Sequence, residues 1–312
     1  MPTENKSKNS EFTVQGLSDL PQLQLPLFVL FLVVYISIVL SNFTVFTCII
    51  LDSHLHSPMY IFLCHLSLLD ISYTSTIVPK LLAMIFTQRN TMSFIECMIQ
   101  LYFFMSFVAI EFLLLTAMAY DRFVAICHPL RYSSFMNQTR CVQLVLAVWV
   151  GGFSESVTHT VLISNLTYCS SRRIDHFFCD VPPLLKLSCS DTYKVEISTF
   201  IIGTLMDFSS LIFTFLSYIF IITAILKIQS ADGRQKAFST CSSHITCVTI
   251  FYGMITCIYM RPASMYSPGQ DKFFALLYVI LLPMLNPLIY TLLNKDFKDA
   301  IKRIGIRHIL AS

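Results

Sequence analysis

The sequence MAYDRFVAICHPLRY at residues 118–132 decides the fold, together with PMLNPLIY at residues 283–290. Each stretch lies near the end of a long apolar segment and carries charged groups or paired prolines. Charges and interrupted backbone hydrogen bonds cost free energy in a membrane, so they occur there mainly where they are buried and functional. We therefore interpret both stretches as functional parts of a membrane protein.

The composition indicates a chain that lies mostly within lipid. Of its 312 residues, 55% are hydrophobic and only 12% are charged, whereas a soluble domain is about a quarter charged. A helix needs roughly 20 largely apolar residues to cross the hydrocarbon. Seven stretches meet that requirement, at residues 25–51, 58–82, 98–126, 141–163, 197–227, 237–260 and 272–293. The sequence therefore predicts an all-α membrane protein, with a seven-transmembrane helix bundle at 25–293 between tails at 1–24 and 294–312.

Basic residues orient the predicted bundle. The carboxy-terminal tail carries a cluster at Lys295, Lys298, Lys302, Arg303 and Arg307, which favours the cytoplasmic side. With seven spans the N-terminus is then extracellular, where Asn5 and Asn165 lie in sequons and offer glycan acceptors. The first 24 residues are polar, unlike a cleavable signal peptide, so the first span is expected to serve as the anchor. A net charge of +3 does not favour nucleic acid as a partner.

Acidic side chains are expected inside this bundle. At about 1.5 Å per residue, Asp70 lies roughly 18 Å and Glu111 roughly 16 Å from the inner helix ends, with Asn286 just beneath. Two carboxyl groups in a low dielectric favour a shared proton or a cation between them. A hydrogen-bonded clasp without an ion is the alternative, and no other cofactor is expected. Asp207 is a further acid within a helix, and we interpret it as satisfying a neighbour rather than a ligand.

A second polar group marks the predicted inner helix ends. Its members are Asp121, Arg122, Tyr218, His244, Asn286, Pro287 and Tyr290. An adjacent Asp-Arg pair is by itself usually a snorkelling interfacial charge. The Asn286-Pro287 pair interrupts backbone hydrogen bonding and provides a hinge. Because aromatic and basic side chains surround Arg122 at one level, the pattern favours a two-state switch.

Apolar and aromatic stripes at helical spacing mark the outer halves of several segments. Such stripes ordinarily serve helix packing, which is the alternative for any single residue. With a few hydroxyl groups, they are also typical of the wall of a small-molecule cavity. The predicted ligand-binding set comprises Phe104, Met105, Val108, Ala109, Ile202, Met206, Tyr252, Ile255, Thr256, Tyr259 and Tyr278.

The sequence does not predict an enzyme, because no residue set offers a nucleophile together with its base. His176, Cys179 and Asp180 are metal-ligand types at close spacing, but a disulfide at Cys179 competes with a metal, and no metal is expected. Four cysteines lie in or beside outer segments, where disulfides form, and they allow three connectivities: Cys97, Cys169, Cys179 and Cys189.

These motifs resemble the odorant (olfactory) receptor family of the rhodopsin-like class A G-protein-coupled receptors. The resemblance runs from about residue 25 to 300 and also rests on KAFSTCSSH at 236–244. It implies disulfides between Cys97 and Cys179 and between Cys169 and Cys189. It makes Arg122 the switch that faces a G protein and implies a polar core that includes Asn42, Asp70 and Glu111. Tyr252 stands where the wider class has a tryptophan, and Gly253 is expected to supply flexibility.

The resemblance implies a receptor that binds small, largely apolar volatile molecules and activates a stimulatory, olfactory-type heterotrimeric G protein to raise cyclic AMP. It implies the plasma membrane, and specifically the cilia of olfactory sensory neurons, as the location. A class A receptor for a non-odorant small molecule, expressed outside olfactory tissue, is the alternative. A transporter would show broken half-helices in paired halves, a pattern this sequence lacks. Residues 295–309 predict a short amphipathic eighth helix, with Phe297, Ile301 and Ile304 toward lipid.

Overall fold

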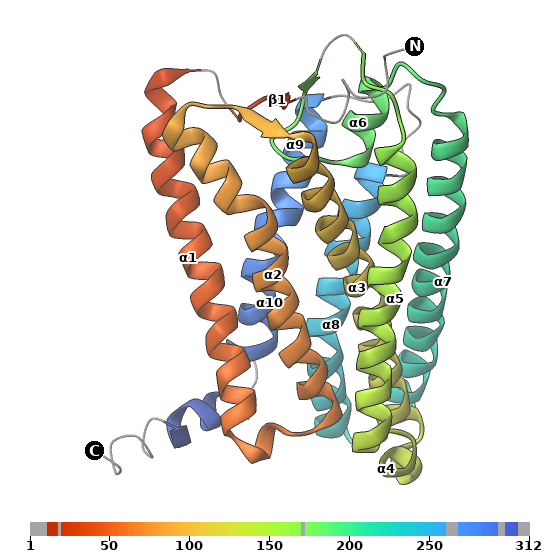
Figure 1. Ribbon diagram of the computed structural model, residues 1–312. Helices are drawn as coiled ribbons and strands as arrows, with labels where there is room; N and C mark the ends of the chain where they lie inside the picture. Colours follow the sequence, from red (N-terminus) through yellow and green to blue (C-terminus); the bar gives the residue numbers. More distant parts are fainter. Residues whose placement is uncertain (1–10, 18–19, 170–171, 260–267, 293–296, 305–312) are drawn as a thin grey trace.

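Figure 1 shows the computed structural model, which describes residues 11–17, 20–169, 172–259, 268–292 and 297–304. Its long helices lie side by side in one bundle: α1 (Pro21–Leu51), α2 (Pro58–Thr87), α3 (Phe94–Cys127), α5 (Gln138–Ser164), α7 (Tyr193–Leu226), α8 (Ala231–Tyr259) and a seventh made of α9 (Pro268–Leu276), η4 (Leu277–Leu281), α10 (Leu282–Pro287) and η5 (Leu288–Leu292). Six spans are long and apolar enough to cross a membrane, and α8 has a shorter apolar stretch at Cys241–Cys257. The predicted seven-helix fold is confirmed.

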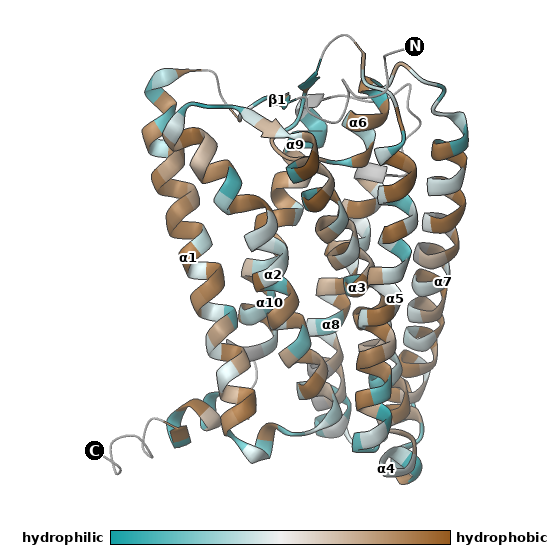
Figure 2. Cartoon of the chain, in the orientation of Figure 1, coloured by the Kyte–Doolittle hydropathy of each residue, from teal (hydrophilic) through white to brown (hydrophobic). Residues whose placement is uncertain are grey.

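The distribution of apolar residues places α3 at the centre of the bundle. Figure 2 shows hydrophobic residues along the outer sides of the helices, where Leu30, Val33 and Phe43 are exposed on α1. In the most apolar 18-residue stretch of each helix, 11% of the residues of α1 are buried, against 72% of the residues of α3. Because α3 contacts α2, α5, α7 and α8, its polar and aromatic side chains lie in the interior.

Local sequence signals explain where the spans begin. Pro58 occupies the first turn of α2, where its missing N–H has no helical partner to lose. Ser93 accepts a hydrogen bond from Glu96 N, and Glu96 Oε2 accepts one from Ser93 N, which makes a capping box before α3. Asn137 Oδ1 accepts a hydrogen bond from Arg140 N and so caps the start of α5. Helix α1 begins at Pro21, earlier than the start at residue 25 expected from hydropathy.

The seventh span departs from α-helical geometry on both sides of α10. Residues Leu277–Leu281 and Leu288–Leu292 adopt π-helical turns. Pro283 and Pro287 lie in the segment between them, and each removes one backbone donor from the helix. The wider turns accommodate those losses, so the backbone is irregular beside Asn286, where the sequence predicts a hinge.

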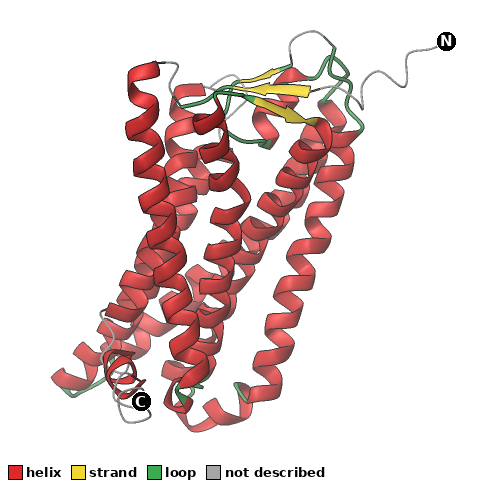
Figure 3. Ribbon diagram, turned by 60° about the vertical axis from the view of Figure 1, so that its left-hand side comes forward, coloured by secondary structure: helices red, strands yellow, loops and turns green. Residues whose placement is uncertain are grey.

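A small sheet covers the outer end of the bundle (Figure 3). Strand β1 (Glu11–Val14) pairs antiparallel with β2 (Thr91–Ser93) and parallel with β3 (Arg173–Ile174). Phe12 and Val14 of β1 are buried, so the strand is held by packing as well as by backbone hydrogen bonds. The sequence predicts only an extracellular tail here, because so short a strand has no recognisable period of its own.

The inner end is joined by short elements and a final helical segment. They are η1 (Ser53–Leu55), η2 (Pro129–Arg131), α4 (Tyr132–Phe135) and helical residues 297–304. Asp52 accepts hydrogen bonds from His54 and Arg303. Burial acts to raise the pKa of the Asp52 carboxyl, but these hydrogen bonds outweigh it and lower that pKa.

The expected lipid-facing position of Phe297 is wrong. Its side chain is 2% exposed and packs into the core of the bundle, as Ala300 does, while Ile301 is exposed. Ile304 is partly buried against the same core. Arg303 binds Asp52, which turns this face of the final helix toward the bundle rather than toward lipid.

Candidate ligand-binding and signalling site

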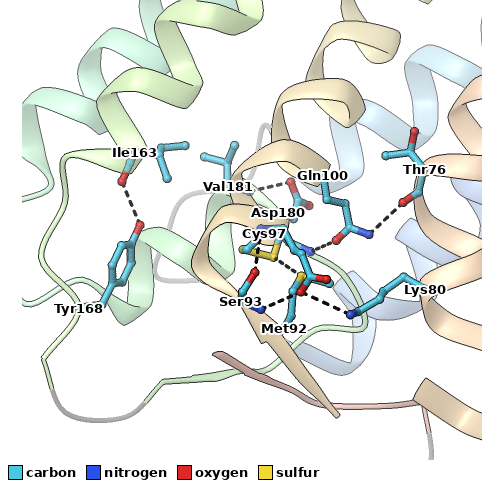
Figure 4. Close-up of a disulfide and its surroundings, with 12 residues drawn as sticks. Thr76, Lys80, Met92, Ser93, Cys97, Gln100, Ile163, Tyr168, Asp180 and Val181 are labelled. Carbon is cyan, nitrogen blue, oxygen red and sulfur yellow. Dashed lines mark hydrogen bonds and ion pairs between the residues drawn. A yellow bond between two sulfur atoms is a disulfide. The ribbon is translucent and has the colours of Figure 1, made fainter. Parts of the chain in front are cut away.

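The outer loop between α5 and α7 is fastened to α3 by a disulfide between Cys97 and Cys179 (Figure 4). Gln100, one turn below Cys97, accepts a hydrogen bond from Cys179 N and donates one to the Thr76 carbonyl of α2. One side chain therefore links the loop to two helices. The disulfide implied by the resemblance is present in this structure, and Gln100 is a partner that sequence reasoning missed.

A second disulfide joins Cys169 to Cys189 within the same loop. It brackets β3 and the short helix α6 (Val181–Leu187), whose first turn is capped by the Asp180 carboxylate accepting from Val181 N. Cys179 and Asp180 are therefore engaged in structural bonds. Among the residues that the structure describes, no three His, Cys, Asp or Glu side chains form a group suited to a metal ion.

The loop sends a cluster of rings toward the bundle. His176, Phe177 and Phe178 are all buried, and the ring centroid of Phe178 lies 4.8 Å from that of Phe104 on α3. Burial and the neighbouring charge of Lys272 lower the pKa of His176 to about 3, so this imidazole is neutral under ordinary conditions. The cluster closes the bundle from outside. Its position follows from its place directly before Cys179, a signal the sequence does contain.

Beneath this cluster, aromatic side chains form a continuous layer through the predicted ligand region. Tyr278 lies against Phe104 and Phe251, with centroids 6.5 Å and 5.9 Å away. Phe112 then contacts both Phe251, at 4.7 Å, and Tyr252, at 5.2 Å. The T-shaped geometry of most of these pairs is the favourable arrangement for aromatic rings. The layer thus joins α3, α8 and the seventh span.

The remaining predicted ligand-binding residues differ in how deeply their side chains are buried. Val108, Ala109 and Ile255 are buried, while Met105, Ile202 and Met206 are half-buried. Thr256 is exposed, because it lies one position beyond Ile255 on α8, and a single step turns a side chain by about 100°. The side chains of Tyr259 and Asp207 lie outside the described part of the structure. The structure therefore groups most of the set around α3 and sets Thr256 apart.

A hydroxyl network continues the aromatic layer inward. The Tyr252 hydroxyl and Ser210 Oγ on α7 are 2.6 Å apart, and Ser210 also donates to the Phe112 carbonyl at 3.1 Å. Ser210 further bonds to Thr116. Tyr252 is thus tied to α3 and α7 through one small residue. Sequence reasoning placed Tyr252 in the cavity but missed Ser210, which carries no distinctive motif.

The predicted polar core assembles around the seventh span. Asn286 Nδ2 lies 3.2 Å and 3.1 Å from the two Asp70 carboxylate oxygens. Asn42 Nδ2 donates to the Pro283 carbonyl at 2.9 Å, which uses an acceptor beside the π-helical turns. Glu111 lies next to Tyr278 and within electrostatic range of Asp70. These side chains connect α1, α2, α3 and α10 in one buried layer.

The predicted switch residues gather at the inner end. Arg122 Nη2 lies 3.3 Å from Asp121 Oδ2, and the Tyr132 hydroxyl of α4 donates to Asp121 Oδ1 at 2.8 Å. The Tyr218 hydroxyl of α7 bonds to His244 Nδ1 of α8. The rings of Tyr218, His244 and Tyr290 lie close enough to the Arg122 guanidinium to interact with its charge.

Tyr132 is an addition to the expected switch. It lies in the inner loop, where its hydroxyl donates to the Asp121 oxygen that Arg122 does not contact.

Asn5, expected to carry a glycan, lies outside the described residues. Asn165 directly follows the last residue of α5 and is exposed in the outer loop, as a glycan acceptor must be.

Comparison with known proteins places this arrangement in a family. The sequence model of the olfactory receptor family matches residues 31–308. The chain is 50% identical to olfactory receptor 5AR1 of Mus musculus and 48% identical to olfactory receptor 5AR1 of Homo sapiens, in both cases over 97% of this chain and 98% of the relative. It is 45% identical to olfactory receptor 5M5 of Mus musculus, over 98% of this chain and 96% of the relative. The chain is a multi-pass plasma-membrane protein, not an enzyme, and it belongs to the olfactory receptor family.

Proposed function

We propose that this protein binds small, largely apolar volatile molecules among α3, α7, α8 and the seventh span, and that binding activates a stimulatory G protein and raises cyclic AMP. The supporting observation is a chain of ring contacts that runs from the outer loop into the middle of the bundle. It passes from Phe178 through Phe104, Tyr278, Phe251 and Phe112 to Tyr252. The Ser210 hydroxyl network then continues it into α7.

The signalling step acts through the interface of α7 with α8. Tyr218 and His244 join these helices beside Arg122, and a small apolar cluster that includes Ile221 and Cys241 packs around them. Outward movement of α8 separates that pair and exposes the guanidinium to a cytoplasmic partner. A ligand shifts the balance only by the difference in its affinity for the two states. Moving the ratio from 1:99 to 99:1 requires about 5.5 kcal/mol.

The test is a cyclic AMP reporter in cells that express the receptor, exposed to a broad panel of volatile compounds. Wild type and Arg131→Gln should respond equally, because Arg131 is exposed on the neighbouring inner loop. Arg122→Gln should abolish the cyclic AMP response at an unchanged surface level. Wild-type protein that reaches the surface and remains silent across the panel would contradict the proposal.

The binding step needs a separate measurement. A compound that activates wild type should raise the unfolding temperature of purified Arg122→Gln protein, because the aromatic layer is remote from the inner end. An activating compound with no such effect on Arg122→Gln would mean that the arginine serves ligand binding rather than signalling.

A further inference from the structure

One group of polar side chains within the membrane takes no part in the site described above. Its members belong to α5 and α7, which run side by side in Figure 1 and contact one another. Its members are Glu155, His159, Thr160 and Thr199. The Oε2 atom of Glu155 and the hydroxyl oxygens of both threonines are buried without a hydrogen-bond partner among the described residues.

Glu155 lies within the hydrocarbon region rather than at its edge. Helix α5 ends at Ser164, nine residues later, which corresponds to a rise of about 13 Å. An acidic side chain at that depth is costly unless it serves a partner, and such residues usually mark a functional site. The packing of the described residues supplies none for Oε2.

His159 fixes the register of α5 against α7. Its ring lies beside the Glu155 carbonyl, with Nδ1 3.4 Å away, and it also hydrogen-bonds to the backbone of Thr199 on α7. The two helices are antiparallel, so a step of four residues down α5 corresponds to a step of four residues along α7. Glu155 is therefore level with Gly203, which has no side chain to occupy the space opposite the carboxyl group.

This register brings Glu155 to the level of residues that the sequence predicts as ligand-binding. Of these predicted residues, Ile202 directly precedes Gly203 on α7 and Met206 follows it by about one turn. On α3, Tyr102 donates to the Phe153 carbonyl of α5 at 3.4 Å, and Met105, about one turn further along α3, is half-buried. Glu155 is therefore level with apolar residues of α7, on a helix that packs against both α3 and α7.

We infer that Glu155 and Gly203 form a polar subsite at the junction of α3, α5 and α7 that takes the amine group of a small apolar ligand. A protonated amine donates to the unpartnered Oε2 and neutralises the carboxylate, and charge-assisted bonds of this kind are the stronger ones. This inference rests on the proposed function, since it names the chemical class that the receptor selects.

The experiment compares two probes of nearly equal shape, 2-heptylamine and 2-heptanone, within a panel of aliphatic amines and ketones of equal length. Their potencies are measured by cyclic AMP on wild type, Glu155→Gln and Glu196→Gln. Glu196 is the matched control because its carboxylate is exposed at the outer end of α7. All variants are compared at equal surface level.

We expect amines to activate wild type at lower concentration than the matched ketones. Glu155→Gln should raise the half-maximal concentration of amines at least tenfold and leave that of ketones within twofold, and Glu196→Gln should change neither. Gly203→Val should add a side chain level with the carboxyl group and weaken amines more than ketones. Equal effects of Glu155→Gln on both classes, or activation by ketones alone, would overturn the subsite while leaving the receptor function intact. A receptor silent to every volatile compound would instead contradict the proposed function.

Discussion

Replacement of Gly152 tests the close packing of α5 against α3. An added Cβ would overlap the Ile110 side chain and would lie 2.9 Å from Ile110 N and 3.0 Å from the Ser106 carbonyl oxygen. Carbon atoms in contact normally remain about 3.5–4.0 Å apart, and two of these three neighbours are backbone atoms that cannot rotate away. The substitution Gly152→Ala must therefore push the two helices apart.

The magnitude follows from two opposing effects. Overpacking of a well-packed interior costs about 1–3 kcal/mol, whereas alanine is favoured over glycine within a helix by about 1 kcal/mol. The net loss of unfolding free energy is therefore up to about 2 kcal/mol. At roughly 2–4 °C per kcal/mol, the unfolding temperature of the purified receptor should fall by up to about 8 °C.

The chain offers a matched control on another helix. A Cβ at Gly253 on α8 would meet no atom within 4 Å, so Gly253→Ala gains the helix preference without the clash. Its unfolding temperature should equal or exceed that of wild type. If Gly152→Ala proved as stable as Gly253→Ala, the claimed contact between α5 and α3 would be refuted.

Two further substitutions examine the interior and the outer loop. Tyr252→Phe removes the 2.6 Å bond to Ser210 and should lower the unfolding free energy by about 1 kcal/mol; an unchanged unfolding temperature would exclude that bond. His176 has a pKa of about 3 when folded and about 6.5 when unfolded, so its contribution to stability is complete above pH 6.5 and is lost as the pH falls towards 3. The unfolding temperature of wild type should therefore fall more steeply between pH 7 and pH 4.5 than that of His176→Leu, and parallel curves would argue against a buried neutral imidazole.

The spans could be predicted because hydrophobicity is a property of each residue and needs no partner. The expected layer of Asp70 with Asn286 also follows from a simple rule, since helical rise converts sequence position into depth. The same rule brings Arg122 to the level of Tyr218. Each of these predictions concerns only the depth of a residue in the membrane.

The rotation of each helix was harder to predict, because one residue of error turns a side chain by about 100°. Thr256 shows this, since it is exposed while Ile255 beside it is buried. Contacts between loops were also out of reach. Phe178 packs on Phe104 only because the disulfide at Cys179 brings the loop over the bundle, and Phe297 turns inward because Arg303 binds Asp52.

Strand β1 has a practical consequence for work with this receptor. Epitopes, cleavage sites and fluorescent proteins are commonly fused to the extracellular terminus of membrane proteins to follow their delivery. Here residues 11–14 are hydrogen-bonded between two other strands and bury Phe12 and Val14. A fusion that replaces or trims this strand uncovers apolar side chains in the secretory lumen, and retention by quality control would then resemble loss of ligand response. Fusions placed ahead of residue 11 keep delivery and recognition separable.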